Sequence, residues 1–342
     1  LFPHCKTKKQ KIYFLGYMTN KLLQTSYGWR KCDDRDSYCN KRLDLTGTLL
    51  NNLFRNYFNK LVKDMQKQII KEINNGSWRS TNNNMNIINK TNIYKIVKST
   101  TIENGLKRAL ATGDFAIKNT NSNSKNKVGV AQVLNRLTYT ASLSHLRRVN
   151  TPIDKSGKLI PPRKVHNTIW GMLCPSESPE GQSVGVVKNI SYLTHITINS
   201  SSSIIYDVLK DKIIPIGGLK PKELFGMVKI IVNGNWIGTS NEPYKLYLDL
   251  KNKKYMGILN IYTSILFDFK NKELIICNEA GRPMRPIFKV KDNKILYSGE
   301  IARKIKNNEI SWDDLFTNHV LDESILEYID PAEQNTTMIS MN

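Results

Sequence analysis

The sequence predicts an α+β protein that contains several domains. Apolar residues recur at helical spacing in residues 9–25 and 45–75. From about residue 200, apolar runs of strand length alternate with turn residues. The chain has 342 residues, 40% of them hydrophobic, which is enough for two or three domains with their own cores. We expect three separately packed units: a helical one over 1–110, a mixed one over 111–198 and a β-rich one over 199–298.

The helical part is dominated by residues 45–75, whose apolar residues form one continuous stripe. We interpret this stripe as core and assign it no function. The polar segment GVAQVLNRLTYTASLSHLRRV at 129–149 predicts two short helices. The stripe consists of Leu49, Leu50, Leu53, Phe54, Tyr57, Phe58, Leu61, Met65 and Ile69.

The β-rich part contains a strong local hairpin signal. Asn233-Gly234 separates two apolar runs in VKIIVNGNWIGTS, and this dipeptide is typical of a two-residue hairpin turn. Residues 258–278 predict two further strands. A short helix is expected at 299–306, followed by a final helical segment.

The net charge of +22 favours an anionic partner, most simply nucleic acid. A solvated surface rich in Lys and Asn would give the same composition, so the charge alone does not decide between the two. No apolar run approaches the roughly 20 residues that span a bilayer. The five cysteines include no C-x-x-C pair, so we expect neither a zinc site nor a disulfide framework, and a reduced compartment fits best.

Few residues suggest catalysis by this chain alone. No glycine pattern of a phosphate-binding loop or dinucleotide fold occurs. His145 and His166 have no Cys or carboxylate at metal-ligand spacing, and the adjacent Ser144 does not make His145 part of a hydrolase site. The acidic cluster CDDRDSYC at 32–39 is the one candidate for metal-dependent nucleotidyl transfer. We interpret it instead as a turn and a cap before the helix at 45.

The segment 147–185 is the strongest candidate for nucleic-acid binding. It begins with six cations within eighteen residues, and its prolines stiffen the chain, which lowers the entropy lost on binding a phosphate track. It ends in a turn that carries Glu177 and Glu180. The alternative is an ordinary charged surface loop. The six cations are Arg147, Arg148, Lys155, Lys158, Arg163 and Lys164.

The sequence from GVAQVLNR to GQSVGVVKNIS, at 129–191, resembles the fork region of the second-largest, β-like subunit of multi-subunit DNA-directed RNA polymerase. The likeness is to the eukaryotic RNA polymerase II and giant-virus type, although ESPEG stands where many members have ETPEG. Other motifs follow in the family's order. FLGYMTNKLL, DDRDSYCNKRLDLTGTLL and GLKRALATGDF resemble the lobe and protrusion, while IVNGNWIG, EAGRPMRPIF and SWDDLFTNHVLDESILEYIDPAE resemble the external domains.

This resemblance implies that the chain is a fragment of that subunit and contains five complete or partial domains. They are the end of the lobe at 1–50, part of the protrusion at 51–115, the fork at 116–198, external domain 1 at 199–298 and part of external domain 2 at 299–342. The first fork loop would lie at 116–129 and the second at 153–159.

The resemblance also implies roles for single residues. Gln132 and Arg148 are expected beside the RNA–DNA hybrid, and Glu177 and Glu180 are expected to line the active centre. No catalytic residue and no metal ligand are expected in this chain. The predicted nucleic-acid contacts are Gln132, Arg136, Arg147, Arg148, Lys155, Lys158, Arg163 and Gln182.

The implied function is a share in template-directed RNA synthesis by a DNA-directed RNA polymerase, a nucleotidyltransferase, in which this chain alone is inactive. Expected partners are the largest subunit, other polymerase subunits, template DNA and the hybrid, with Mg²⁺ held by the largest subunit and no cofactor held by this segment. The nucleus, or a virus factory or virion, would be its location. The alternative is a polymerase-derived nucleic-acid-binding or scaffold protein without transcription activity.

Overall fold

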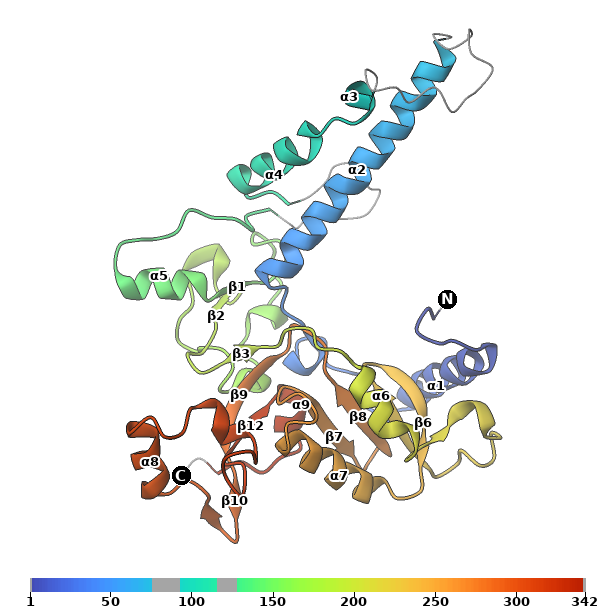
Figure 1. The fold of residues 1–342 in the computed structure, drawn as a ribbon, viewed down its shortest axis with the longest axis vertical. Helices are drawn as coiled ribbons and strands as arrows, with labels where there is room; N and C mark the ends of the chain where they lie inside the picture. Colours follow the sequence, from blue (N-terminus) through green and yellow to red (C-terminus); the bar gives the residue numbers. More distant parts are fainter. Residues whose placement is uncertain (1, 76–92, 116–127, 341–342) are drawn as a thin grey trace. The chain divides into compact units, whose positions relative to one another are not determined.

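The chain folds into two compact units that each contain helices and extended segments (Figure 1). The structure is a computed structural model, and it describes residues 2–75, 93–115 and 128–340. The helical unit comprises residues 44–158 and 180–187, and the sheet unit comprises residues 1–43, 159–179 and 188–342. The α+β class is confirmed. The five domains expected along the chain stay a prediction.

The helical unit is organised by two helices that lie side by side, α2 (Thr46–Asn74) and α4 (Thr100–Thr112) (Figure 1). Leu53, Ala109 and Phe115 form its buried core. The helices approach so closely that a Cβ added to Gly105 would lie 2.3 Å from Cε1 of Tyr57. The other elements of the unit are α3 (Ile93–Ile96), α5 (Tyr139–Leu146), β1 (Arg148–Asn150) and the 3₁₀ turn η5 (Gly181–Ser183).

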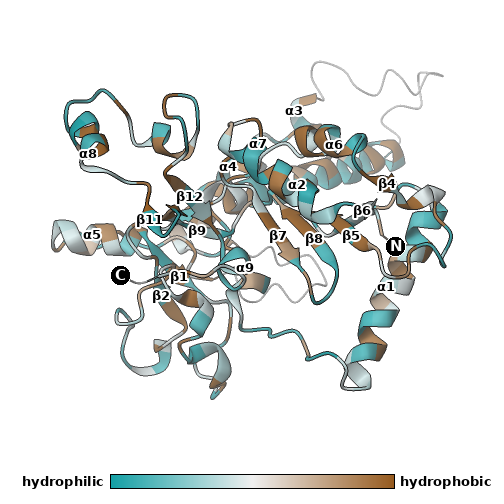
Figure 2. Cartoon of the chain, turned by 90° about the horizontal axis from the view of Figure 1, so that it is seen from below, coloured by the Kyte–Doolittle hydropathy of each residue, from teal (hydrophilic) through white to brown (hydrophobic). Residues whose placement is uncertain are grey.

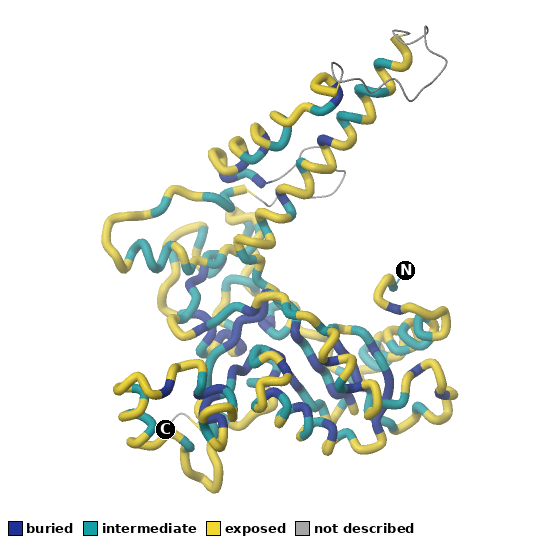
Figure 3. Tube along the Cα trace, in the orientation of Figure 1, coloured by how far each residue is buried: buried dark blue, intermediate teal, exposed yellow. Residues whose placement is uncertain are grey.

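The apolar stripe of α2 is only partly core, so the prediction of a continuous buried stripe is wrong. Leu53 and Leu61 are buried, whereas Phe54 and Phe58 remain 47% and 48% exposed and stack on each other with ring centroids 6.2 Å apart. Most of α2 is drawn as exposed or intermediate in Figure 3. Its apolar face is wider than the surface that α4 covers among the described residues.

The segment 129–149 contains one helix, α5, instead of the two that were expected. Polar side chains set where this helix begins. The backbone N–H of Leu137 donates to Asn135 Oδ1 at 3.0 Å, and that of Ala141 donates to Thr138 Oγ1 at 3.1 Å. Asn135 satisfies a backbone donor that precedes the helix, and Thr138 caps the first turn, so the helix begins only after Thr138.

The sheet unit is built on a five-stranded sheet of order β4-β6-β5-β8-β7, in which only β5 and β8 run parallel. The predicted hairpin is confirmed: Asn233 and Gly234 connect β5 to β6 with φ of 48° and 76°. The two strands predicted in 258–278 are β7 and β8. The strand bounds are β4 (Ile214–Pro215), β5 (Val228–Val232), β6 (Asn235–Ser240), β7 (Ser264–Asp268) and β8 (Glu273–Cys277).

Helices cover both faces of this sheet, and strands β5, β7 and β8 are largely hydrophobic in Figure 2. On one face, α6 (Ser203–Lys210) and α7 (Pro243–Tyr255) enclose the largest core cluster. On the other, aromatic residues of α1 (Lys8–Ser26) pack against Ile231 and Trp236. The helix expected at 9–25 therefore forms, but it packs on the sheet instead of joining a helical unit over 1–110. The helix packs there because the sheet buries part of its aromatic residues Tyr13, Phe14 and Tyr17. This burial decides its position, although the helices of residues 45–110 are closer in sequence.

A three-stranded sheet of order β12-β9-β3 and its own core complete the sheet unit. The helix expected at 299–306 is confirmed as α8, whereas the final helical segment is limited to α9 and follows a strand. In the described ranges, none of the helices combines the length and apolar character of a membrane span. The bounds are β3 (His195–Ile196), β9 (Pro283–Phe288), β10 (Val290–Lys291), β11 (Lys294–Ile295), α8 (Gly299–Lys306), β12 (Leu326–Ile329) and α9 (Pro331–Gln334).

A buried network of charges joins α7 to β12 and α9. Lys251 Nζ lies 2.5 Å from Glu327 Oε1 and 2.9 Å from Glu333 Oε1, and Lys254 Nζ lies 3.1 Å from Glu327 Oε1. All four side chains are at most 12% exposed. Burial alone would raise the pKa of the Glu327 carboxyl, but Lys254 and Lys251 outweigh it and hold that pKa well below its usual range.

We expect Glu327→Gln to lower the free energy of unfolding of the sheet unit by about 3–5 kcal/mol, because it leaves two buried ammonium groups short of a partner. Urea unfolding at pH 7 measures this. Since the pKa is depressed, the stabilisation is present above the unfolded-state pKa of about 4.3 and is lost as pH falls further. Glu242→Gln, which breaks an exposed pair with Lys245, is the control and should cost under about 1 kcal/mol. Equal losses in both variants would contradict the network's importance.

Candidate nucleic-acid interface

The helical unit holds most of the predicted site residues. Arg163 and Glu177 belong to the sheet unit. The residues in the helical unit are Gln132, Arg136, Arg147, Arg148, Lys155, Lys158, Glu180 and Gln182.

Gln132 lies in an irregular segment that is tied to α5 by side-chain hydrogen bonds. Its Nε2 donates to the carbonyl of Gly129 at 2.9 Å, and its Oε1 lies 3.0 Å from Nε2 of His145. The other ring nitrogen of His145 accepts the backbone N–H of Asn135 at 3.0 Å. Ser142 Oγ donates to the carbonyl of Asn135 at 2.7 Å. Two side chains on α5 thus hold the segment that carries Gln132, which stays exposed.

The start of the same segment is fixed by a glycine. The backbone N–H of Val130 donates to the carbonyl of Gly113 at 3.0 Å, just beyond the end of α4. Gly113 has a φ of 70°, and a Cβ there would lie 2.4 Å from the carbonyl oxygen of Ala131. Only glycine allows this approach, so the chain that leads to Gln132 is anchored to α4 as well as to α5.

Residues 154–157, within the stretch predicted to be the second fork loop, form a hydrogen-bonded turn. The backbone N–H and the hydroxyl of Ser156 both donate to Asp154 Oδ1, at 3.0 and 2.8 Å. The N–H of Gly157 donates to the carbonyl of Asp154 at 3.3 Å. The bonds from the Ser156 side chain and backbone lower the pKa of the Asp154 carboxyl. Lys155 lies within this ordered turn and Lys158 follows it, and both are exposed.

The arginines around α5 differ in burial. Arg147 ends α5 and is half-buried, whereas Arg148 begins β1 and is exposed. Arg136 is also exposed. Within the ranges that the structure describes, Arg136, Arg148 and Lys158 make no ion pair with a carboxylate.

Glu180 and Gln182 lie at the turn η5, and both are exposed. Gly181 between them has a φ of 73°, which glycine adopts without strain. The structure thus leaves Gln132, Arg148 and Gln182 at exposed positions of one unit, and their convergence on a single face stays a prediction. Residues 116–127, nearly all of the predicted first fork loop, lie outside the described residues.

In the sheet unit, Arg163 ends the turn η3 (Pro161–Arg163) and is half-buried. Glu177 is exposed, and its backbone is held by the Cys174 sulfur at 3.4 Å and by the Asn189 amide at 3.1 Å. Their roles at an interface remain a prediction.

The acidic cluster at 32–39 forms a turn, as expected, but does not cap α2. The N–H of Asp36 donates to Asp34 Oδ1 at 2.9 Å, and Asp34 Oδ2 lies 2.7 Å from His166 Nε2. Leu45 precedes α2 without a side-chain cap, so that part of the prediction is wrong. No group of three His, Cys, Asp or Glu side chains suited to a metal occurs among the described residues.

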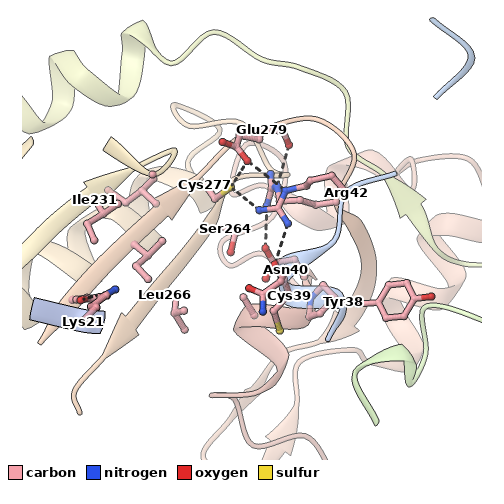
Figure 4. Close-up of a pocket in the computed structure, with 18 of the residues that line it drawn as sticks. Lys21, Tyr38, Cys39, Asn40, Arg42, Ile231, Ser264, Leu266, Cys277 and Glu279 are labelled. Carbon is pink, nitrogen blue, oxygen red and sulfur yellow. Dashed lines mark hydrogen bonds and ion pairs between the residues drawn. The ribbon is translucent and has the colours of Figure 1, made fainter. Parts of the chain in front are cut away.

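A cavity of about 470 Å³ opens on the second face of the five-stranded sheet (Figure 4). Its lining includes Arg42, which pairs with Glu279 at 3.4 Å and lies 4.0 Å from the Cys277 sulfur. None of the predicted site residues lines it. Burial raises the pKa of the Cys277 thiol, so this cysteine is poorly suited to act as a nucleophile.

Sequence patterns did not indicate the hydrogen-bonding role of His145 and Ser142. One signal was present: the two residues are three apart, so they share a helix face, and they follow a polar segment. Which backbone groups they bind depends on how the chain folds back, and no local pattern encodes that.

Comparisons with known proteins find matches along most of this chain. Three family models match: RNA polymerase Rpb2, domain 2, over residues 1–44; domain 3, over 132–196; and domain 4, over 230–291. The model for domain 3 covers all the described site residues from Gln132 to Gln182.

Three full-length relatives align with almost all of this chain. DNA-directed RNA polymerase II subunit RPB2 of Encephalitozoon cuniculi is 41% identical over 99% of the chain, and subunit 2 of Arabidopsis thaliana is 39% identical over 99%. DNA-directed RNA polymerase subunit 2 of Acanthamoeba polyphaga mimivirus is 34% identical over 98%. The chain spans 27–28% of the length of these relatives.

We expect Asp154→Ala to loosen the 154–157 turn, because Ser156 then loses the acceptor of two hydrogen bonds. Amide hydrogen exchange at Ser156 should become several-fold faster. Asp314→Ala is a matched control, since Asp314 accepts the same two bonds from Ser311, and it should leave Ser156 unchanged. The lowered pKa of Asp154 means that the turn persists at neutral pH and loosens only as pH falls below about 4. Unchanged exchange in Asp154→Ala would rule out this account of the turn.

Proposed function

Since the chain belongs to the family of second-largest subunits of DNA-directed RNA polymerases, we propose that it acts within a transcribing polymerase, where its helical unit contacts nucleic acid. In this proposal, Gln132, Arg148 and Gln182 face the RNA–DNA hybrid. The loop with Lys155 and Lys158 meets DNA at the downstream edge.

The observation that carries this proposal is the set of exposed cations without carboxylate partners among the described residues. Arg136, Arg148 and Lys158 keep their full charge at the surface of the helical unit. By contrast, Lys251 and Lys254 of the sheet unit are buried and neutralised by glutamates. Exposed cations on an ordered surface bind a phosphate backbone favourably, because binding releases the counterions of the nucleic acid.

The proposed contribution is positional. The lysine loop offers ammonium groups and no Asn or Gln side chain, so it is suited to phosphates and not to base edges. Held in place by the Asp154 turn, it would keep downstream DNA in register for chemistry on another subunit. We expect Mg²⁺ to be held by the largest subunit, and the isolated chain to synthesise no RNA.

The remaining assignments rest on the same family membership. The partners would be the largest and other polymerase subunits, together with the template strand and the hybrid. The location would be the nucleus, or a virus factory or virion. Arg163 would add to the cationic track, and Glu177 and Glu180 would line the active centre or orient neighbouring cations.

Replacing Lys155 and Lys158 together with Ala should weaken DNA binding about equally for all sequences. The slope of log affinity against log salt should fall by about 0.9 for each lost phosphate contact on duplex DNA. Fluorescence anisotropy at several salt concentrations measures both quantities. Replacing Lys220 and Lys222, two exposed lysines of the sheet unit, removes the same charge and is the control. A sequence-selective loss, or the same slope change in the control, would argue against a phosphate-contacting loop.

Arg148→Ala should weaken binding to an RNA–DNA hybrid by about 1.5–3 kcal/mol, the range for hydrogen bonds to a charged group. The exposed Arg303 of α8 offers a control, because Arg303→Ala removes the same charge from the sheet unit. Titration of labelled hybrid against each variant gives the comparison. If both variants lose the same small amount, Arg148 acts only through net charge and the assignment to the hybrid fails.

A further inference from the structure

We infer that His145, held as a single neutral tautomer, is a positioning residue that sets the amide orientation of Gln132. This inference rests on the proposed contact between Gln132 and the hybrid. His145 extends from α5, and each of its ring nitrogens has one partner on the segment that precedes the helix.

The backbone of Asn135 determines the tautomer. Its N–H is a donor only, and it lies 3.0 Å from Nδ1 of His145, so Nδ1 must be an unprotonated acceptor. In the neutral ring the proton then resides on Nε2. Nε2 therefore donates to its own partner, Oε1 of Gln132, at 3.0 Å.

The tautomer in turn determines the amide. Because Nε2–H needs an acceptor, the Gln132 oxygen faces His145 and the amide nitrogen faces Gly129, whose carbonyl it reaches at 2.9 Å. Both ends of the amide are engaged, so a flip would place donor against donor and oxygen against oxygen. The second N–H of Gln132 has no partner among the described residues, and a lone N–H donor on an exposed side chain suits a phosphate or a ribose hydroxyl.

Ser142 allows two roles to be distinguished: setting the orientation of the Gln132 amide, and holding the segment that carries Gln132 in place. It lies on the same face of α5 and donates to the Asn135 carbonyl at 2.7 Å, but within the described residues no hydrogen bond joins it to Gln132. Loss of Ser142 Oγ should loosen the segment without reversing the amide. Loss of His145 should remove the only α5 donor that faces Gln132 among the described residues.

Two substitutions distinguish the two hydrogen bonds of the imidazole, because each can preserve only one of them. In His145→Gln, the amide nitrogen can take the place of Nε2 and still donate to Gln132. In His145→Asn, the amide oxygen can take the place of Nδ1 and accept from Asn135, but the side chain is too short to reach Gln132. We expect hybrid binding to stay within about 2-fold of the parent for His145→Gln and to fall about 2- to 12-fold for His145→Asn, as for one lost net hydrogen bond.

The test combines ring ¹⁵N NMR of the full chain with hybrid titrations of His145→Asn, His145→Gln, Ser142→Ala, Gln132→Ala and the double variant His145→Asn/Gln132→Ala. The NMR signal that disappears in His145→Asn belongs to His145 and should have the pattern of an Nε2–H tautomer. The double variant should bind no worse than Gln132→Ala, because His145 acts through Gln132. Thermal unfolding of each variant identifies those that lose binding by losing structure.

Several results would overturn the inference. An Nδ1–H tautomer excludes the proposed hydrogen-bond direction. Additive losses in the double variant, or a loss in Ser142→Ala equal to that in His145→Asn, reduce His145 to general support. If Gln132→Ala weakens binding while His145→Asn does not, the inference alone fails. If Gln132→Ala binds as tightly as the parent, the proposed contact of Gln132 with the hybrid fails as well.

Discussion

Backbone groups that belong to no helix or strand must find other hydrogen-bond partners, and the candidate interface is organised around this constraint. Residues 132–136 have no regular structure, yet Ser142 and His145 of α5 satisfy the carbonyl and the N–H of Asn135. The same helix thus fixes the segment that carries Gln132. After α5 ends at Leu146, the strand β1 begins at Arg148. The position of both candidate contacts therefore depends on a short helix with two polar side chains on one face.

The cations of this chain differ in environment. The sheet unit buries Lys251, Lys254 and Arg282 with carboxylates, at side-chain exposures of 12% or less. Such pairs are costly to break but offer nothing to a partner. The helical unit leaves Arg148 and Lys158 at the surface. The net charge of +22 is therefore a poor guide to function until the cations are separated by environment.

Features set by a few neighbouring residues were predictable from the sequence. The Asn233-Gly234 hairpin formed as expected, because the left-handed backbone that it needs is a local property of these two residues. Features that depend on packing against residues far away in the sequence could not be predicted. Phe54 has the apolar spacing of a core residue but remains half-exposed, and α1 found its partner in a sheet more than two hundred residues away. His145 belongs to this second group, since its role depends on where residues 129–137 fold back.

The close approach of α2 and α4 has a consequence for genetics. At Gly105 even a methyl group would overlap the Tyr57 ring, so a substitution must displace that ring or move the two helices apart, while every charged residue of the interface stays unchanged. A smaller side chain at position 57 would make room for the added Cβ. Residues 57 and 105 are therefore expected to change together.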